Sequence, residues 1–206
     1  MRAIYTIHID QKTMALQIHN IVSSALILII TLSLNTITQA HFSEESVVKS
    51  PPKLTKLHFY FHDIPNGKHP TAIIIARPEN QTTIGFGTLV MADDPLTEGP
   101  EISSKLVGRA QGMYGESSHT ESSLIMTITF TFTDNIYNGS SISILGRYRV
   151  SEKQREMPIV GGSGVFRLAR GYALAKTYKY DLKTGVAVSE YNVFVLHHIH
   201  DTSLMH

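Results

Sequence analysis

The chain has 206 residues, with 18 Lys and Arg, 17 Asp and Glu, and no cysteine, and this length is enough for one domain with a substantial core. The lack of cysteine excludes disulfides, thiolate zinc sites and iron–sulfur clusters. The balanced charge gives no electrostatic reason to expect nucleic acid or an anionic membrane as a partner.

The first 40 residues are predicted to be a cleavable signal peptide. The apolar run 21–30 is short for a membrane span, and Thr38-Gln39-Ala40 follows it as a small-x-small cleavage pattern. The positive flank ahead of the run is thin, so Met14 is an alternative start. A retained membrane anchor is the competing interpretation. We therefore expect a secreted, extracellular protein with no membrane attachment after cleavage.

Two N-glycosylation sequons lie beyond the signal segment. They are Asn80-Gln81-Thr82 and Asn138-Gly139-Ser140, and both have turn-like surroundings in which a glycan would project into water. In a secreted chain we expect Asn80 and Asn138 to carry glycans.

Most of the chain after residue 53 alternates between apolar and polar residues with a period of two, which is typical of half-buried β-strands. The clearest case is Leu124–Thr133, where large apolar residues hold the even positions and threonine holds most odd ones. We predict eight strands, near residues 54–62, 71–77, 84–91, 104–114, 124–133, 141–148, 165–180 and 186–196. Turn residues separate them, including Asp93-Asp94-Pro95.

Eight sequential strands with short links predict an all-β fold, an eight-stranded antiparallel up-and-down β-barrel, with a two-sheet sandwich as the alternative. The expected domain spans residues 54–198, between a flexible segment at 41–53 and a tail at 199–206. No long amphipathic helix interrupts the strands, which argues against a parallel βαβ topology.

The strand faces suggest a lumen with room for a small ligand. Small residues share one face near 104–114 and again near 169–177, and inward-facing small residues would open a cavity. Phe59, Phe61 and Asp63 also share a face, which places a carboxylate at the end of an aromatic strip. The opposite faces are apolar as well, so we expect sister subunits to cover them in a homo-oligomer.

Two other patterns, a glycine-rich run and a group of histidines, bear on nucleotide and metal binding. Gly161-Gly162-Ser163-Gly164 has no following lysine, and Val165-Phe166 after it favours a strand, so we interpret the run as a tight bend rather than a phosphate loop. The histidines near the C-terminus lack a recognised ligand spacing, so no metal site is predicted. No cofactor is expected.

Several long motifs, spread over essentially the whole mature chain, resemble those of the plant dirigent family. They are FYFHDI (59–64), FGTLVMADDPLTEGPE (86–101), SKLVGRAQGMY (104–114), YNGSSISILGR (137–147), REMPIVGGSGVFRLARGYALAKT (155–177) and EYNVFVLH (190–197). The resemblance implies an allene-oxide-cyclase-like barrel, usually a trimer, secreted to the apoplast. A dimer is the alternative oligomer.

The resemblance also implies candidate site residues. Asp63 matches a pocket acid, Tyr114 a pocket tyrosine, Arg155 an arginine that anchors substrate oxygens, and Thr177 a position that shapes specificity. Tyr148 stands where pinoresinol-forming members carry an aspartate, so the second acid of that cyclisation is missing.

We therefore assign Asp63, Tyr114 and Arg155 as candidate catalytic residues, and Phe59, Phe61, Tyr148 and Thr177 as candidate substrate-binding residues. The alternative interpretation is that Asp63 has no catalytic role and only caps the turn that follows its strand. Asp134, in a nearby loop, is a candidate replacement for the missing acid.

The function implied by the family is stereoselective coupling of phenoxy radicals, such as those of coniferyl alcohol, in lignan and phenylpropanoid biosynthesis. An external oxidase, a laccase or a peroxidase, would supply the radicals. The alternatives are a quinone-methide cyclase of the pterocarpan-synthase type acting on isoflavanols, or a secreted phenolic- or sugar-binding protein of plant defence without catalysis. The sequence leaves open whether the chain is an enzyme.

Overall fold

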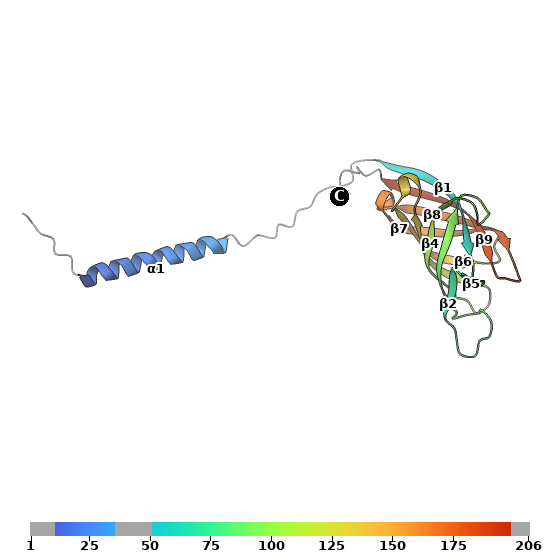
Figure 1. The fold of residues 1–206 in the computed structure, drawn as a ribbon, viewed down its shortest axis with the longest axis horizontal. Coiled ribbons are helices and arrows are strands. Elements are labelled where there is room, and N and C mark those ends of the chain that lie inside the picture. Colours follow the sequence, from blue (N-terminus) through green and yellow to red (C-terminus); the bar gives the residue numbers. More distant parts are fainter. Residues whose placement is uncertain (1–10, 36–50, 199–206) are drawn as a thin grey trace, which may run out of the picture. The chain divides into compact units, whose positions relative to one another are not determined.

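The computed structural model describes residues 11–35 and 51–198 (Figure 1). The chain divides into two units, residues 1–46 and 47–206. In the first, α1 spans Gln11–Asn35. Among the described helices, none has the length and hydropathy needed to cross a membrane. The predicted cleavage site at residues 38–40, most of the segment 41–53 and the tail 199–206 lie outside the described residues.

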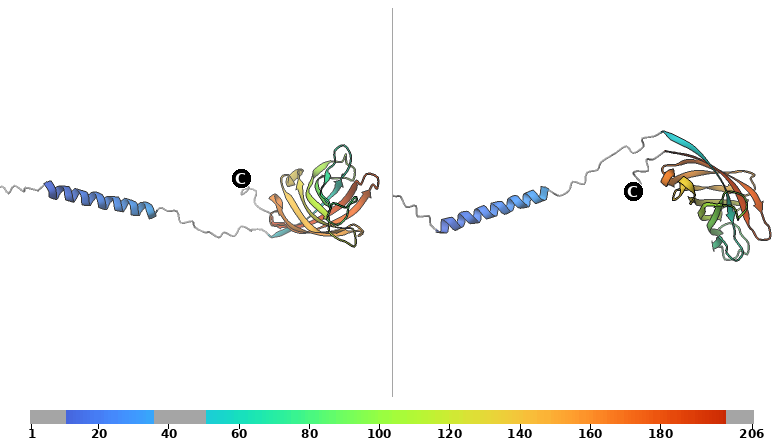
Figure 2. Two further views of the ribbon diagram at one scale, coloured as in Figure 1. Left: turned by 90° about the horizontal axis from the view of Figure 1, so that it is seen from below. Right: turned by 45° about the horizontal axis from the view of Figure 1, so that its top comes forward.

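The second unit is a closed antiparallel β-barrel, as the sequence predicted (Figure 2). Its sheet runs in the order β1-β9-β8-β7-β6-β5-β4-β3-β2, and a further pairing of β1 with β3 closes the ring of eight strands. The strands are β1 (Pro52–Asp63), β2 (Ala72–Ala76), β3 (Leu89–Thr97), β4 (Leu106–Glu116), β5 (Ser123–Phe132), β6 (Ser141–Arg149), β7 (Arg155–Ser163), β8 (Arg170–Tyr180) and β9 (Ala187–His198). Two 3-10 turns, η1 (Asn135–Tyr137) and η2 (Gly164–Phe166), connect strands.

One edge of β3 is shared between two partners. β2 pairs with its first half, from Leu89 to Ala92, and β1 pairs with its end, at Leu96 and Thr97. The ring of eight therefore consists of β1 and β3 to β9, and β2 is a ninth, short strand that lies alongside β3.

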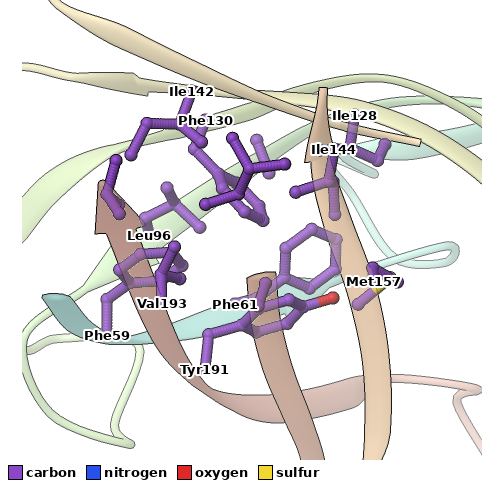
Figure 3. Close-up of a cluster of buried hydrophobic side chains, with 14 of the residues drawn as sticks. Phe59, Phe61, Leu96, Ile128, Phe130, Ile142, Ile144, Met157, Tyr191 and Val193 are labelled. Carbon is purple, nitrogen blue, oxygen red and sulfur yellow. The ribbon is translucent and has the colours of Figure 1, made fainter. Parts of the chain in front are cut away.

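Alternate side chains fill the lumen with apolar groups, as the period of two predicts. Phe59 stacks on Tyr191 with ring centroids 5.7 Å apart and meets Phe130 edge to face at 5.1 Å. Figure 3 shows these rings with Phe61 and Met157 in one cluster, and the hydroxyl of Tyr191 is a polar atom among them. Aromatic pairs of this geometry add to the hydrophobic gain of burial.

The small inward-facing residues do not open a cavity in this part of the lumen. Ala110, Ala173 and Ala175 are completely buried members of the same cluster as the aromatic rings. Their small side chains leave space for large ones from other strands, which is how interiors reach close packing.

The structure corrects the prediction of a turn at Asp93-Asp94-Pro95, because these residues belong to β3. The N–H of Asp93 donates toward β2, to the carbonyl of Thr71 at 2.9 Å. The ring nitrogen of Pro95 has the same orientation, two residues further on, and lies where β3 has neither β2 nor β1 as a partner. A proline in this place loses no ladder hydrogen bond.

The structure also corrects the glycine run and the strand after it. Gly161 and Gly162 lie within β7, which the sequence prediction missed, and β8 begins only at Arg170. The bend is confirmed at Gly164, where φ is +60° and η2 starts. This turn carries Phe166 into the core, where it stacks on Tyr137 with centroids 5.1 Å apart.

Candidate functional site at one end of the lumen

The strand registers gather five of the predicted site residues at one end of the barrel, here called the mouth. Asp63 ends β1, Tyr114 lies near the end of β4, and Tyr148 and Arg155 lie on β6 and β7 on either side of one connection. Thr177 joins them because Arg155 pairs with Ala175 of β8, two residues before it. Residues from five strands thus meet at this end, although they are far apart in the sequence.

Asp63 and Tyr114 form the acidic side of the mouth. The Tyr114 hydroxyl donates to Asp63 Oδ2 at 2.7 Å, while the buried Oδ1 has no hydrogen-bond partner. Burial raises the pKa of Asp63, and the hydrogen bond from Tyr114 only partly opposes this. The pKa of Tyr114 is raised by burial and by the charge of Asp63, so its hydroxyl stays protonated as a donor.

Asp94 is a second buried carboxyl group on this side, and the sequence interpretation missed it. It is 0% exposed, and the Thr71 hydroxyl donates to its Oδ1 while Oδ2 has no partner. Burial, followed by the charge of Asp63, raises the pKa of Asp94 to about 7. Two carboxyl groups are therefore coupled electrostatically at the mouth.

Arg155 forms the cationic side, three strands away from β1 through β9 and β8. It is only 2% exposed; its Nη1 donates to the carbonyl of Glu152 at 2.9 Å and its Nη2 to Thr177 Oγ1 at 3.0 Å. The guanidinium lies 4.4 Å from the ring centre of Tyr148, a cation–π contact. The buried Nε has no partner.

Arg155 is not held by a surface ion pair. In the described part of the chain no carboxylate lies within ion-pair distance of it, and the side chain of Glu152 binds Arg149 instead, at 2.8 Å. A buried guanidinium without a counter-ion is costly, and the N–H of its buried Nε is a hydrogen-bond donor that is not used within the described residues.

Tyr191, on β9 between the two sides, was also missed as a site residue. It is 1% exposed, packs on Phe59 and Phe61, and its pKa is raised well above the ordinary value, first by burial. Charges from Arg155 and Asp63 both act on its hydroxyl. The predicted aromatic residues Phe59 and Phe61 thus support the mouth from the core beneath it.

The structure shows where Tyr148 and Asp134 lie relative to Asp63, and so whether either could replace the missing second acid. Tyr148 lies with Arg155 on the cationic side. Asp134 is wrong as a replacement, because it follows β5 at the opposite end of the barrel and pairs with Lys105 at 2.7 Å. Asp94 is the carboxyl group that stands beside Asp63.

The two sequon asparagines and one groove lie on the surface of the barrel. Asn80 and Asn138 are both exposed in turns, which leaves their side chains accessible. A surface groove of about 280 Å³ lies near the end of β1 and the β8–β9 hairpin and is lined in part by His62, Tyr178 and Asp181. None of the predicted site residues lines this groove, whereas the unpartnered buried atoms of Asp63, Asp94 and Arg155 belong to the mouth.

These features define a class of closed antiparallel barrels with a polar candidate site at one end of an apolar lumen. A family model described as "Dirigent-like protein" matches residues 54–196. The chain belongs to the dirigent family, as its motifs predicted.

Its relatives include proteins with two kinds of name. Pterocarpan synthase 1 of Glycyrrhiza echinata is 52% identical over 149 residues, covering 71% of this chain and 79% of that protein. Dirigent protein 1 of Arabidopsis thaliana is 51% identical over 150 residues, covering 71% and 81%. The solved structure of the pterocarpan synthase dirigent protein GePTS1 superposes with a TM-score of 0.73 at 48% identity, covering 77% of this chain and 99% of that one.

Proposed function

We propose that the chain is a dirigent-type cyclase that closes a ring in a phenolic substrate through a quinone methide, with isoflavanols as the substrate class. The observation that carries the proposal is a partly buried acid, Asp63, and a buried guanidinium, Arg155, at the same end of one lumen, each with a buried polar atom that has no partner. The identity to proteins named pterocarpan synthase supports the substrate class.

The two sides of the mouth suit the two ends of such a substrate. A protonated carboxyl donates its proton to the benzylic hydroxyl of the isoflavanol, the C–O bond breaks with its electron pair, and water leaves. The phenol oxygen at the far end of the conjugated system gives its proton to water and becomes the quinone-methide carbonyl, which accepts a hydrogen bond from Arg155 Nε.

Ring closure then restores the acid. The phenol oxygen of the neighbouring ring adds to the benzylic carbon, its proton goes to the carboxylate, and the quinone-methide oxygen takes a proton back from water. The net change is loss of one water, with no oxidation or reduction. The protein supplies orientation and proton transfer, which together account for large rate effects in well-positioned reactions.

The sequence-based expectation of radical coupling is the second candidate. It rests on the resemblance and on the name of relatives such as Dirigent protein 1. Coupling to pinoresinol calls for an acid where Tyr148 stands, and Tyr148 here packs against the guanidinium of Arg155. We therefore place cyclisation first.

The test is a product assay on both substrate classes. Purified full-length protein is incubated with an isoflavanol, and separately with coniferyl alcohol plus a laccase, and the products are resolved on a chiral column. We expect accelerated pterocarpan formation, slowed roughly a hundredfold in Asp63→Asn. Glu156→Gln, at an exposed carboxylate of β7, is the matched control and should retain full activity.

Either of two results would overturn the proposal. Cyclisation that is no faster than in buffer would remove the cyclase. A skewed enantiomeric ratio in the coupling assay alone would assign the chain to radical coupling with an external oxidase.

We also propose that the chain acts as a secreted homo-oligomer, a trimer in line with its family. Large apolar side chains lie exposed on several strands, among them Met91 on β3, Met113 on β4, Leu145 on β6 and Tyr172 on β8. Exposed apolar surface of this kind marks interaction sites. Sedimentation equilibrium that gives a monomer mass at micromolar concentration would contradict the oligomer.

A further inference from the structure

Asp94 stands out as a buried ionisable group that the proposed reaction does not use. It lies on β3 in the inward alternation of Val90, Ala92, Asp94 and Leu96, all of which are buried. Nearly all buried polar atoms in proteins have partners, so the unpartnered Oδ2 of a fully buried carboxyl group calls for an explanation.

Thr71 fixes the position of Asp94 and satisfies its other oxygen. The hydroxyl of Thr71 accepts from the N–H of Ile64 at 3.3 Å and donates its single proton to Asp94 Oδ1. The carbonyl of Thr71 accepts from the N–H of Asp93 at 2.9 Å. The carboxyl group is therefore held where β1 ends, and a proton on it must reside on Oδ2.

Among residues 51–198 no cation forms an ion pair with Asp94. Arg109 lowers its pKa only as a minor influence, because the side chain of Arg109 is bound to the exposed Asp93, at 2.6 Å, on the outer face. Asp93 and Asp63 both act in the opposite direction, and burial is the largest effect. The pKa of about 7 lies within the range in which a site must hold and release protons at neutral pH.

We propose that Asp94 is a positioning residue that couples to Asp63, so that the two carboxyl groups together retain one proton at neutral pH. Asp63 is the member of the pair that exchanges this proton with the substrate, and Tyr114 orients it by donating to its Oδ2. Two carboxyl groups in one low-dielectric site cannot both ionise easily, so the second proton leaves at a pH where a single carboxyl group would already be charged. The catalytic part of this inference rests on the proposed function.

The first experiment is the pH dependence of cyclisation in Asp94→Asn. The amide keeps an acceptor for Thr71 but removes the charge, so Asp63 alone must hold the proton. We expect the alkaline limb of the pH–rate profile to move to lower pH by about one unit or more, with the rate on the acid side retained. Glu156→Gln, at an exposed carboxylate of β7 that does not act on Asp94, is the control and should leave the limb in place. A limb that is unmoved in Asp94→Asn overturns the proposal.

A second measurement does not depend on activity. Infrared difference titration of the full-length protein reports protonated carboxyl groups directly, and we expect one to titrate near pH 7 and to disappear in Asp94→Asn. If it titrates but no substrate is cyclised, the acid pair stands and the proposed function falls. If cyclisation occurs with no carboxyl group titrating near neutral pH, the pair falls and the function stands.

Should Asp94→Asn fail to fold, Thr71→Val serves in its place. This variant removes the hydrogen bond that lowers the pKa of Asp94, so the infrared titration should move to higher pH. An unchanged titration in Thr71→Val would show that the titrating group is not Asp94.

Discussion

The two ends of the lumen are built on opposite principles. At the end of the barrel that holds η2, here called the η2 end, Phe166 stacks on Tyr137, and the hydroxyl of Ser140 accepts a hydrogen bond from the N–H of Val165 at 3.0 Å. At the mouth, buried atoms of Asp63, Asp94 and Arg155 have no partner. Unpartnered buried polar groups cost stability, and proteins retain them where function requires them. The η2 end therefore stabilises the barrel, and the mouth is where we place the proposed chemistry.

The largest expected effect is a loss of stability when the packed part of the lumen is disrupted. Phe130→Ala removes a fully buried ring that contacts Phe59 and Tyr191. We expect a loss of about 3–5 kcal/mol in the free energy of unfolding, measured by urea denaturation. Val160→Ala, at an exposed position on β7, should change this free energy by less than about 0.5 kcal/mol. Equal losses in the two variants would show that the lumen is not the main core.

The next effect is a pH dependence of the free energy of unfolding, which arises from the buried carboxyl group at the mouth. Because burial raises the pKa of Asp94 from 3.8 to about 7, the folded state binds its proton more tightly than the unfolded state. Its contribution to stability is fully present below about pH 4 and is lost as the pH rises through 7, by at most about 4 kcal/mol. The raised pKa of Asp63 acts in the same direction.

Asp94→Asn is the control for this dependence, since an amide does not titrate. Its free energy of unfolding should decline less steeply between about pH 4 and 7 than that of the unaltered chain. Parallel curves for the two proteins would contradict the assignment to Asp94.

A smaller effect tests the cationic side of the mouth. Arg155→Lys keeps the charge but loses the planar group that stacks on Tyr148 and the Nε donor. We expect kcat/KM for cyclisation to fall roughly tenfold to thirtyfold, about 1.4–2 kcal/mol. Arg170→Lys, at an exposed arginine of β8, should leave the kinetics unchanged. Wild-type kinetics in Arg155→Lys would remove the guanidinium from substrate binding.

The parts of the barrel predicted from sequence are those whose faces alternate strictly. Phe59 and Phe61 are both buried, as the alternation along their strand predicted, whereas Tyr114 was identified only through the family resemblance. Period two is a direct consequence of strand geometry, so it is readable without tertiary information. The same alternation predicts which side chains of each strand point into the lumen.

The parts that were missed are those where tertiary context overrides local preference. Asp93-Asp94-Pro95 has strong turn chemistry, yet the barrel needs β3 to continue and offers Pro95 an unpaired position. Gly161 and Gly162 likewise lie in β7 because their neighbours supply the ladder. The buried alternation Val90, Ala92, Asp94 was the signal that would have found the second acid, and the turn motif obscured it.

The smallest effect distinguishes a support from a reacting group at the mouth. Thr177 is exposed, but its hydroxyl accepts from Arg155 Nη2 at 3.0 Å and so helps to orient the guanidinium. Thr177→Val keeps the shape and removes the acceptor, and we expect KM to rise about fivefold, near 1 kcal/mol, with kcat little changed. Thr177→Ser retains the hydroxyl and should behave as the unaltered chain. If kcat fell instead while KM stayed constant, Thr177 would act in the reaction itself, and the division of the mouth into reacting groups and their supports would need to be redrawn.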